Sequence, residues 1–220
     1  MKKYFVIFML LFIYACGGSQ AIPQWKDTAS RQLENYKINF LTDKENIDEP
    51  HFIKARNAIS SNNDLQLLAK AYLMKYALHT AVLEDFDDRD FLRIDKLEPN
   101  VANRAYYDLL KGNISQLNET NLKPAYQKLL HLMRDKNVSA ATKEIASIDD
   151  PLSRLIACGI WVKYMPYNEN IIKLAIDTAS QDGWRRPLWA YLNKLQKYYL
   201  DRQETDKAEN IKERLELLKK

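Results

Sequence analysis

Glycine is scarce in this sequence, with five residues among 220. Two of them, Gly17 and Gly18, lie close to the N-terminus, which leaves three for any folded part. A loop that holds phosphate with backbone amides needs several glycines near one another. Runs that alternate between apolar and polar residues, bounded by turn residues, are nearly absent as well, and such runs mark β-strands. The sequence therefore argues against a phosphate-binding glycine loop and against a fold built on strands.

Cysteine and histidine are also rare. Of the two cysteines, Cys16 and Cys158, the second lies in the apolar stretch LIACGIW, where a free cysteine is expected to be a small buried hydrophobe. The three histidines, His51, His79 and His131, are far apart and fit no metal-ligand spacing such as HExxH. The motifs GxSxG and SxxK are absent too. We therefore predict no enzymatic activity, no catalytic residue and no cofactor.

Long apolar runs are limited to one, the residues from Tyr4 to Ala15, which follow Lys2 and Lys3. Twelve residues of helix are about 18 Å long, whereas the hydrocarbon core of a bilayer is about 30 Å thick. A short apolar core after basic residues is typical of a secretory signal peptide, and a retained membrane span is the poorer interpretation.

The residues Ile13-Tyr14-Ala15-Cys16 resemble the lipobox of bacterial lipoproteins, in which an aliphatic residue, a variable residue and Ala or Gly precede the cysteine. The resemblance implies that the Cys16 thiol carries diacylglycerol, that the signal is cut just before it, and that this lipid attaches the protein to a membrane. Gly17, where Asp would retain the protein at the inner membrane, favours the periplasmic face of the bacterial outer membrane, and the inner membrane is the alternative. An ordinary signal peptide that ends at a chance cysteine is the other interpretation.

This interpretation divides the chain into a signal peptide at residues 1–15, a lipidated cysteine with a short linker at 16–23, and a single helical-repeat domain at 24–220. Once the signal peptide is removed, 31 basic and 29 acidic residues remain, so the net charge is close to balance. A nucleic-acid-binding protein would concentrate basic residues on one face. We therefore expect no nucleic-acid partner.

The spacing typical of helices recurs along the rest of the chain. From Trp25 the apolar positions continue through Ala29, Leu33, Tyr36 and Phe40, which share one helix face. The stretch 64–84 is long, rich in Ala and Leu, and free of Gly and Pro, and it begins with an aspartate that suits an N-cap. Prolines stand just ahead of later periodic runs, where they favour helix starts, at Pro50, Pro99, Pro124, Pro151 and Pro187.

Pro151 and Pro187 are 36 residues apart, and each opens a unit of two helices. Repeated units of this length are typical of an α-solenoid. The last unit resembles a tetratricopeptide repeat in the positions Leu192, Leu195, Tyr199, Ala208 and Ile211, although the signature glycine and the closing proline are missing. We predict an all-α fold, a right-handed α-solenoid of helical hairpins, with an irregular antiparallel helical bundle as the alternative.

An acidic stretch, LEDFDDRDFLRID, is the strongest metal candidate in the sequence, with Asp85, Asp87, Asp88 and Asp90 close together. Calcium is bound by several carboxylates in a flexible loop, but the glycine and glutamate of an EF-hand loop are missing here. We favour a solvated loop between helices, whose acids cap the neighbouring helices, and predict no metal.

The segment GWRRPLWAYL places Arg185 and Arg186 between Trp184 and Trp189. Arginine beside exposed aromatic residues is typical of protein-binding hot spots, so these four residues are the partner-binding candidates. The alternative is that the tryptophans fill the seam between the last hairpins while the arginines face water. In DKNVS, Asn137 belongs to an NxS sequon preceded by an acid, the pattern that some bacteria glycosylate, and a chance match in a surface turn is the alternative.

The function expected from these observations is that of a lipid-anchored scaffold, which binds another envelope protein as an assembly or docking factor. It would present a groove or patch rich in Tyr, Trp and Arg. An accessory factor or enzyme that acts on peptidoglycan or lipid, and a purely structural lipoprotein, are the alternatives. This expectation depends on the anchor and the fold class, since no sequence motif marks a site.

Overall fold

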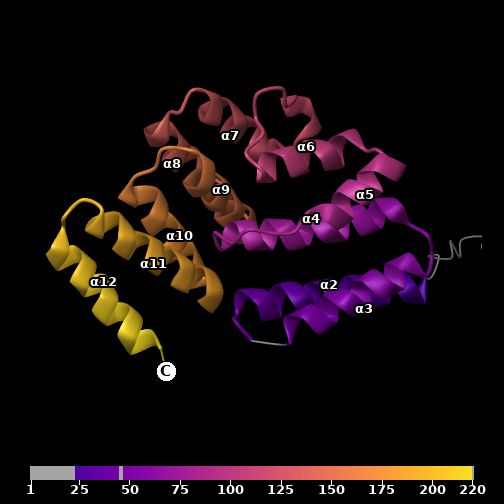
Figure 1. Cartoon of the computed structure of the whole chain (residues 1–220), viewed down its shortest axis with the longest axis horizontal. Helices are drawn as coiled ribbons and strands as arrows, with labels where there is room; N and C mark the ends of the chain where they lie inside the picture. The colour runs from indigo at the N-terminus through magenta and orange to yellow at the C-terminus, as the bar shows by residue number, and fades with distance from the viewer. Residues whose placement is uncertain (1–22, 45–46, 220) are drawn as a thin grey trace, which may run out of the picture.

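The computed structural model describes residues 23–44 and 47–219, so the expectations for residues 1–15, for Cys16 and for most of the linker lie outside the described residues. The described part forms eleven α-helices and one 3-10 turn and contains no strand (Figure 1). These elements are α2 (Gln24–Leu41), α3 (Asp48–Ser60), α4 (Leu65–Ala81), α5 (Arg89–Leu97), α6 (Val101–Leu110), η1 (Glu119–Asn121), α7 (Pro124–Arg134), α8 (Val138–Ala146), α9 (Pro151–Tyr164), α10 (Glu169–Gln181), α11 (Arg185–Leu200) and α12 (Thr205–Leu218). The predicted all-α class is confirmed.

Consecutive helices pack as antiparallel hairpins over much of the chain. Helix α2 packs on α3, α9 packs on α10, α10 on α11 and α11 on α12, as they would in a solenoid. Two further contacts join elements that are distant in sequence, since α4 packs on α9 and α11 packs on α2. Figure 1 shows the result, with α4 in the middle and the last hairpins returned to the first. The fold therefore combines the stacked hairpins of a solenoid with the non-consecutive packing of a bundle.

Helix boundaries follow the capping residues that the sequence indicates. The Asp64 carboxylate accepts a hydrogen bond from the Leu67 amide at 2.9 Å, and the Asp150 carboxylate accepts one from the Ser153 amide at 2.8 Å. Gly183 follows α10 with a φ of +66°, the left-handed conformation that ends helices at glycine. The predicted helix starts after Asp64 and at Pro151 are confirmed.

The contact between α4 and α9 depends on Gly159. A Cβ atom at this position would lie 2.1 Å from the carbonyl oxygen of Thr80, so only glycine lets the two backbones approach this closely. Its neighbour Cys158 is completely buried, as the sequence predicted, and burial raises the pKa of its thiol to about 12. At neutral pH this cysteine is therefore a protonated core residue.

Among the described helices, none combines the length and the apolar composition that crossing a bilayer requires. The core extends along the whole arc of helices as one cluster of buried apolar side chains. The described part is thus held together by apolar packing between helices, and its pockets lie where the helix pairs diverge.

Candidate functional site

The four predicted partner-binding residues lie at the start of α11 and face different surroundings. Trp184 and Trp189 are half-buried and pack against the core. Arg185 is exposed, and its guanidinium donates to the carbonyl oxygen of Leu218 at 3.3 Å. The structure therefore separates two adjacent arginines, because Arg186 points the other way, into the molecule.

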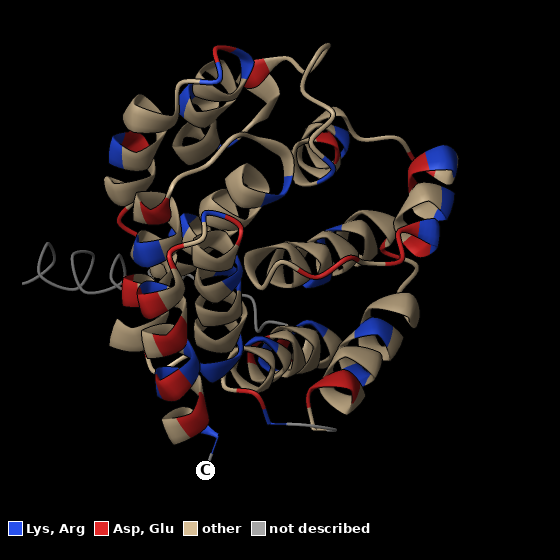
Figure 2. Cartoon of the chain, turned by 60° about the vertical axis from the view of Figure 1, so that its left-hand side comes forward, with Lys and Arg blue, Asp and Glu red and all other residues tan. Residues whose placement is uncertain are grey.

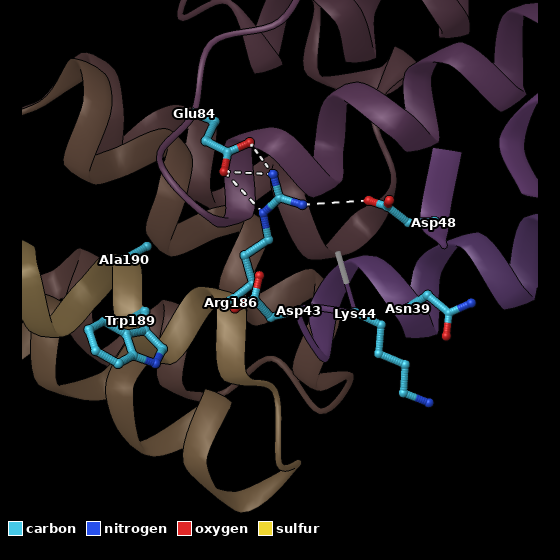
Figure 3. A pocket seen from close by; sticks show the side chains of 8 residues that line it. All are labelled: Asn39, Asp43, Lys44, Asp48, Glu84, Arg186, Trp189 and Ala190. Carbon is cyan, nitrogen blue, oxygen red and sulfur yellow. Dashed lines mark hydrogen bonds and ion pairs between the residues drawn. The ribbon is translucent and has the colours of Figure 1, made fainter. Parts of the chain in front are cut away.

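Arg186 joins three separate parts of the fold (Figure 3). Its Nε and Nη2 donate to the two carboxylate oxygens of Glu84 at 3.0 Å each, and its Nη1 lies 3.6 Å from the carboxylate of Asp48. The guanidinium also lies over the ring of Phe40, 3.9 Å from the centroid. One side chain of α11 thus contacts α2, α3 and the segment that follows α4, with both edges and one face of its guanidinium engaged.

Glu84 is the centre of this charged cluster. Its Oε2 lies 2.8 Å from Nδ1 of His79, and its backbone carbonyl accepts a hydrogen bond from Lys163 at 2.6 Å. Burial acts to raise the pKa of the Glu84 carboxyl, but the hydrogen bond with His79 and the positive charge of Arg186 outweigh burial and lower this pKa. The carboxylate is therefore charged at neutral pH, as its pairing with Arg186 requires.

A polar pocket of about 520 Å³ lies beside this cluster and is drawn in Figure 3. Its lining includes Arg186 and Trp189 but neither Trp184 nor Arg185, so the structure brings two of the four candidates together. The guanidinium donors of Arg186 are already engaged by Glu84 and Asp48. We therefore assign Arg186 a structural role in holding helices together, and not a role in binding a ligand in this pocket. The pocket is lined by Asn39, Asp43, Lys44, Asp48, Glu84, Arg186, Trp189 and Ala190.

The residues Asp85, Asp87, Asp88 and Asp90 lie in the connection between α4 and α5 and in the first turn of α5. The expected capping is only partial, since the Asp88 side chain at the N-cap of α5 makes no capping hydrogen bond, while the Asp87 carboxylate accepts one from the Arg89 amide at 3.1 Å. The four carboxylates face basic side chains instead of one another. Among the described residues, no three His, Cys, Asp or Glu side chains lie close enough to hold a metal ion. The pairs are Asp85 with Lys163 at 2.8 Å, Asp87 with Arg89, Asp88 with Lys111 at 2.9 Å, and Asp90 with Arg93 at 4.0 Å.

The sequon residue Asn137 is exposed in the connection between α7 and α8. Its side-chain oxygen accepts a hydrogen bond from the Ala140 amide at 3.1 Å and so caps the first turn of α8. This capping gives Asn137 a structural role that is independent of any glycan.

A second, more apolar groove of about 580 Å³ lies between α4, α6, α7 and α9. The sequence predicted a groove or patch rich in Tyr, Trp and Arg, whereas this groove contains two tyrosines and neither Trp nor Arg in its lining. Its position was not predicted, because the lining comes from four helices and no local pattern marks it. We call this site the central groove. Its apolar lining includes Leu73, Met74, Ala77, Tyr106, Leu152 and Ile156.

Two tyrosines form one wall of the central groove. The rings of Tyr106 and Tyr126 stack with centroids 5.8 Å apart and an interplanar angle of 24°. Burial raises the pKa of both phenols, so both hydroxyls are neutral at physiological pH. Lys70 and Lys123 lie at the edge of the groove, are exposed, and form no ion pair with any described residue. The groove therefore has an apolar and aromatic lining, and its charged lining residues are Lys70, Lys123 and Asp150, whose carboxylate caps α9.

Comparison with family models, with curated proteins and with solved structures gives no significant match to this chain.

Proposed function

We propose that this protein is a non-enzymatic lipoprotein on the periplasmic face of the bacterial outer membrane, and that its helical domain binds another envelope protein through the central groove. The anchor rests on the lipobox-like residues that end in Cys16, and the binding role rests on the groove. The shape and chemistry of the groove are the observation that carries the proposal.

The size of the central groove supports a peptide segment as its occupant. A volume of about 580 Å³ is within the range of sites that bury several side chains, and the floor is mostly aliphatic and aromatic. Grooves between helices accept the apolar face of a partner helix or segment, with anchors at successive turns. The central groove fits this mode of recognition because apolar side chains line it from four helices.

The edge of the groove indicates the charge of the partner. Lys70 on α4 and Lys123 before α7 are exposed and make no ion pair within the described residues. An acidic side chain of the partner beside its apolar anchors would pair with one of these lysines, and such pairs at the edge of an interface raise the association rate and fix orientation. The proposed partner segment is therefore apolar and carries at least one Asp or Glu.

The test uses the lipidated protein in the bacterium that makes it, with crosslinking, purification from membranes and mass spectrometry. Ala102 is an exposed alanine in the wall of the groove, and Ala102→Arg places a long charged side chain there without disturbing the core. Ala146 is an exposed alanine at the end of α8, outside the groove, and Ala146→Arg is the matched control. We expect one envelope protein to be captured by the wild type and by Ala146→Arg, and to be reduced at least tenfold with Ala102→Arg.

The anchor is tested in the same cells with Cys16→Ala. We expect this variant to lose labelling by a radioactive fatty acid and to leave the membrane fraction, because one thiol carries the lipid. Equal capture of the partner by Ala102→Arg and by the wild type would contradict binding in the groove. Unchanged fatty-acid labelling of Cys16→Ala would contradict the anchor.

A further inference from the structure

The corner formed by the end of α5 and the start of α6 exposes two apolar side chains four positions apart in the chain. Leu97 ends α5 and is 75% exposed, and Val101 begins α6 and is 68% exposed. Isolated exposed apolar residues are common on protein surfaces, so exposure alone gives them no role. The position of this corner in the fold, the charges beside it and its distance from the proposed anchor are what distinguish it from other exposed apolar residues.

The corner lies at the end of the molecule where the described chain begins. Gln66, in the first turn of α4, donates to the carbonyl oxygen of Glu98 at 2.9 Å, so the corner sits beside the start of α4. Helix α3 ends next to the start of α4, and α2 packs antiparallel on α3, with Gln32 hydrogen-bonded to His51 at 2.6 Å. The first turn of α2 is therefore at the same end, as Figure 1 shows at its right-hand side.

The chain length between Cys16 and α2 limits the distance between the folded domain and a lipid anchor. Seven residues extend at most about 25 Å, even when fully stretched. If Cys16 carries lipid, the end of the domain that holds the first turn of α2 must therefore lie within about 25 Å of the bilayer surface. The corner with Leu97 and Val101 is part of that end.

The charges around the corner are of both signs, with Arg89, Arg93 and Lys96 against Asp90, Asp95 and Glu98 in residues 89–98. The basic side chains least engaged by these carboxylates are Lys96 and Arg93. Lys96 is exposed without an ion pair to any described residue, and Arg93 is exposed with only a 4.0 Å contact to Asp90. Both belong to α5, and Figure 2 shows Lys and Arg interspersed with Asp and Glu along the described helices. Glu98 is the one carboxylate between the two exposed apolar residues, and it opposes attraction to an anionic surface. Each basic residue near an anionic surface adds about 1 kcal/mol of attraction at physiological ionic strength.

We propose that the α5–α6 corner contacts the membrane that holds the lipid, with Leu97 and Val101 inserted between lipid headgroups and Lys96 and Arg93 facing anionic phosphates. This inference rests on the proposed anchoring at Cys16. It adds a second, protein-borne contact that orients the domain on the membrane.

The test uses residues 16–220 with Cys16→Ser, which carries no lipid, and vesicles of phosphatidylethanolamine and phosphatidylglycerol at 3:1. Leu97→Cys and Leu217→Cys are labelled with an environment-sensitive fluorophore, while Cys158 stays unlabelled because it is fully buried. Leu217, 77% exposed at the end of α12, is the matched control and lies away from the corner (Figure 1). We expect a blue shift on addition of vesicles with the label at residue 97 and none with the label at residue 217.

Partition into the vesicles is measured by sedimentation. Leu97→Ser with Val101→Ser should lower the partition coefficient about tenfold, as expected when several methylene groups leave the interface. Leu217→Ser should leave it unchanged, and Glu98→Gln should raise it. Equal blue shifts at both labels, or no binding to vesicles by the parent protein, would overturn the proposal. Such a result would leave fatty-acid labelling at Cys16 and partner capture by the groove untouched, so the two proposals fail separately.

Discussion

At the scale of single residues, Gly159 is a position where the fold tolerates little change. Its α-carbon faces the backbone of Thr80 on α4, and any side chain would displace one helix from the other. Alanine has the higher helix propensity by about 1 kcal/mol, so a purely local view favours Gly159→Ala. The structure indicates that Gly159→Ala lowers the free energy of unfolding, because overpacking in the closed interface between α4 and α9 costs more than the helix propensity of alanine contributes.

We predict that Gly159→Ala lowers the free energy of unfolding by about 2 kcal/mol. The measurement is urea unfolding followed by circular dichroism, with wild type and variant compared at the same pH. Ala157, also fully buried on α9, is a neighbour at which Ala is already accommodated, so small side chains are not excluded from this helix in general. An unchanged or higher midpoint for Gly159→Ala would mean that α4 and α9 do not meet as closely as the structure shows.

At the scale of secondary-structure elements, helix starts depend on individual caps. Asp150 precedes Pro151, accepts a hydrogen bond from the Ser153 amide, and so satisfies one of the free amides in the first turn of α9. Its neighbour Asp149 is exposed and makes no hydrogen bond within the described residues. Asp149 and Asp150 carry the same charge at neighbouring positions, but only Asp150 caps the helix. Substituting each in turn therefore distinguishes the effect of the cap on stability from the effect of the charge.

We predict that Asp150→Ala lowers the free energy of unfolding by about 1 kcal/mol, whereas Asp149→Ala changes it by less than about 0.5 kcal/mol. Urea unfolding of both variants provides the comparison, since each removes one negative charge from the same place. Equal losses of stability in the two variants would assign the effect to charge and contradict the capping role.

The elements were largely predictable from the sequence, whereas the sites were not. The helix that follows Asp64 and the helix that follows Asp150 have local signals, because a cap and a periodic apolar face both lie within a few residues. Arg186 and Glu84 are 102 residues apart, and no sequence pattern near either residue predicts that they form an ion pair. The sequence therefore selected Arg186 as a binding candidate, and only the fold shows that its donors are engaged inside the molecule. The central groove could not be predicted either, because its lining comes from four helices that are separated in the sequence.

At the scale of the whole molecule, one ion-pair cluster ties the end of the chain to its beginning. Arg186 on α11 reaches Glu84 after α4, Asp48 on α3 and the ring of Phe40 on α2. Its side chain is 28% exposed, so its bidentate pair with Glu84 is partly shielded from water. Arg186 therefore adds an ion pair to the packing of α11 on α2, which closes the helical arc.

We predict that Arg186→Met lowers the free energy of unfolding by about 2 kcal/mol, because it leaves the half-buried Glu84 without its main counter-charge. Amide hydrogen exchange should become faster in α2 and α3 before it changes in α9 and α10. Arg185→Met is the matched control, since Arg185 is exposed and contacts only the last turn of α12. Equal effects of the two substitutions on exchange in α2 would contradict the closure through Arg186.

The central claim, that the groove between α4, α6, α7 and α9 binds an envelope protein, is tested most directly by photo-crosslinking in living cells. A photoreactive amino acid replaces Ala102 in the groove wall or, as the control, Ala146 on α8. We expect one strong adduct from position 102, absent from position 146 and lost without ultraviolet light. No adduct from position 102, or the same adducts from both positions, would contradict it.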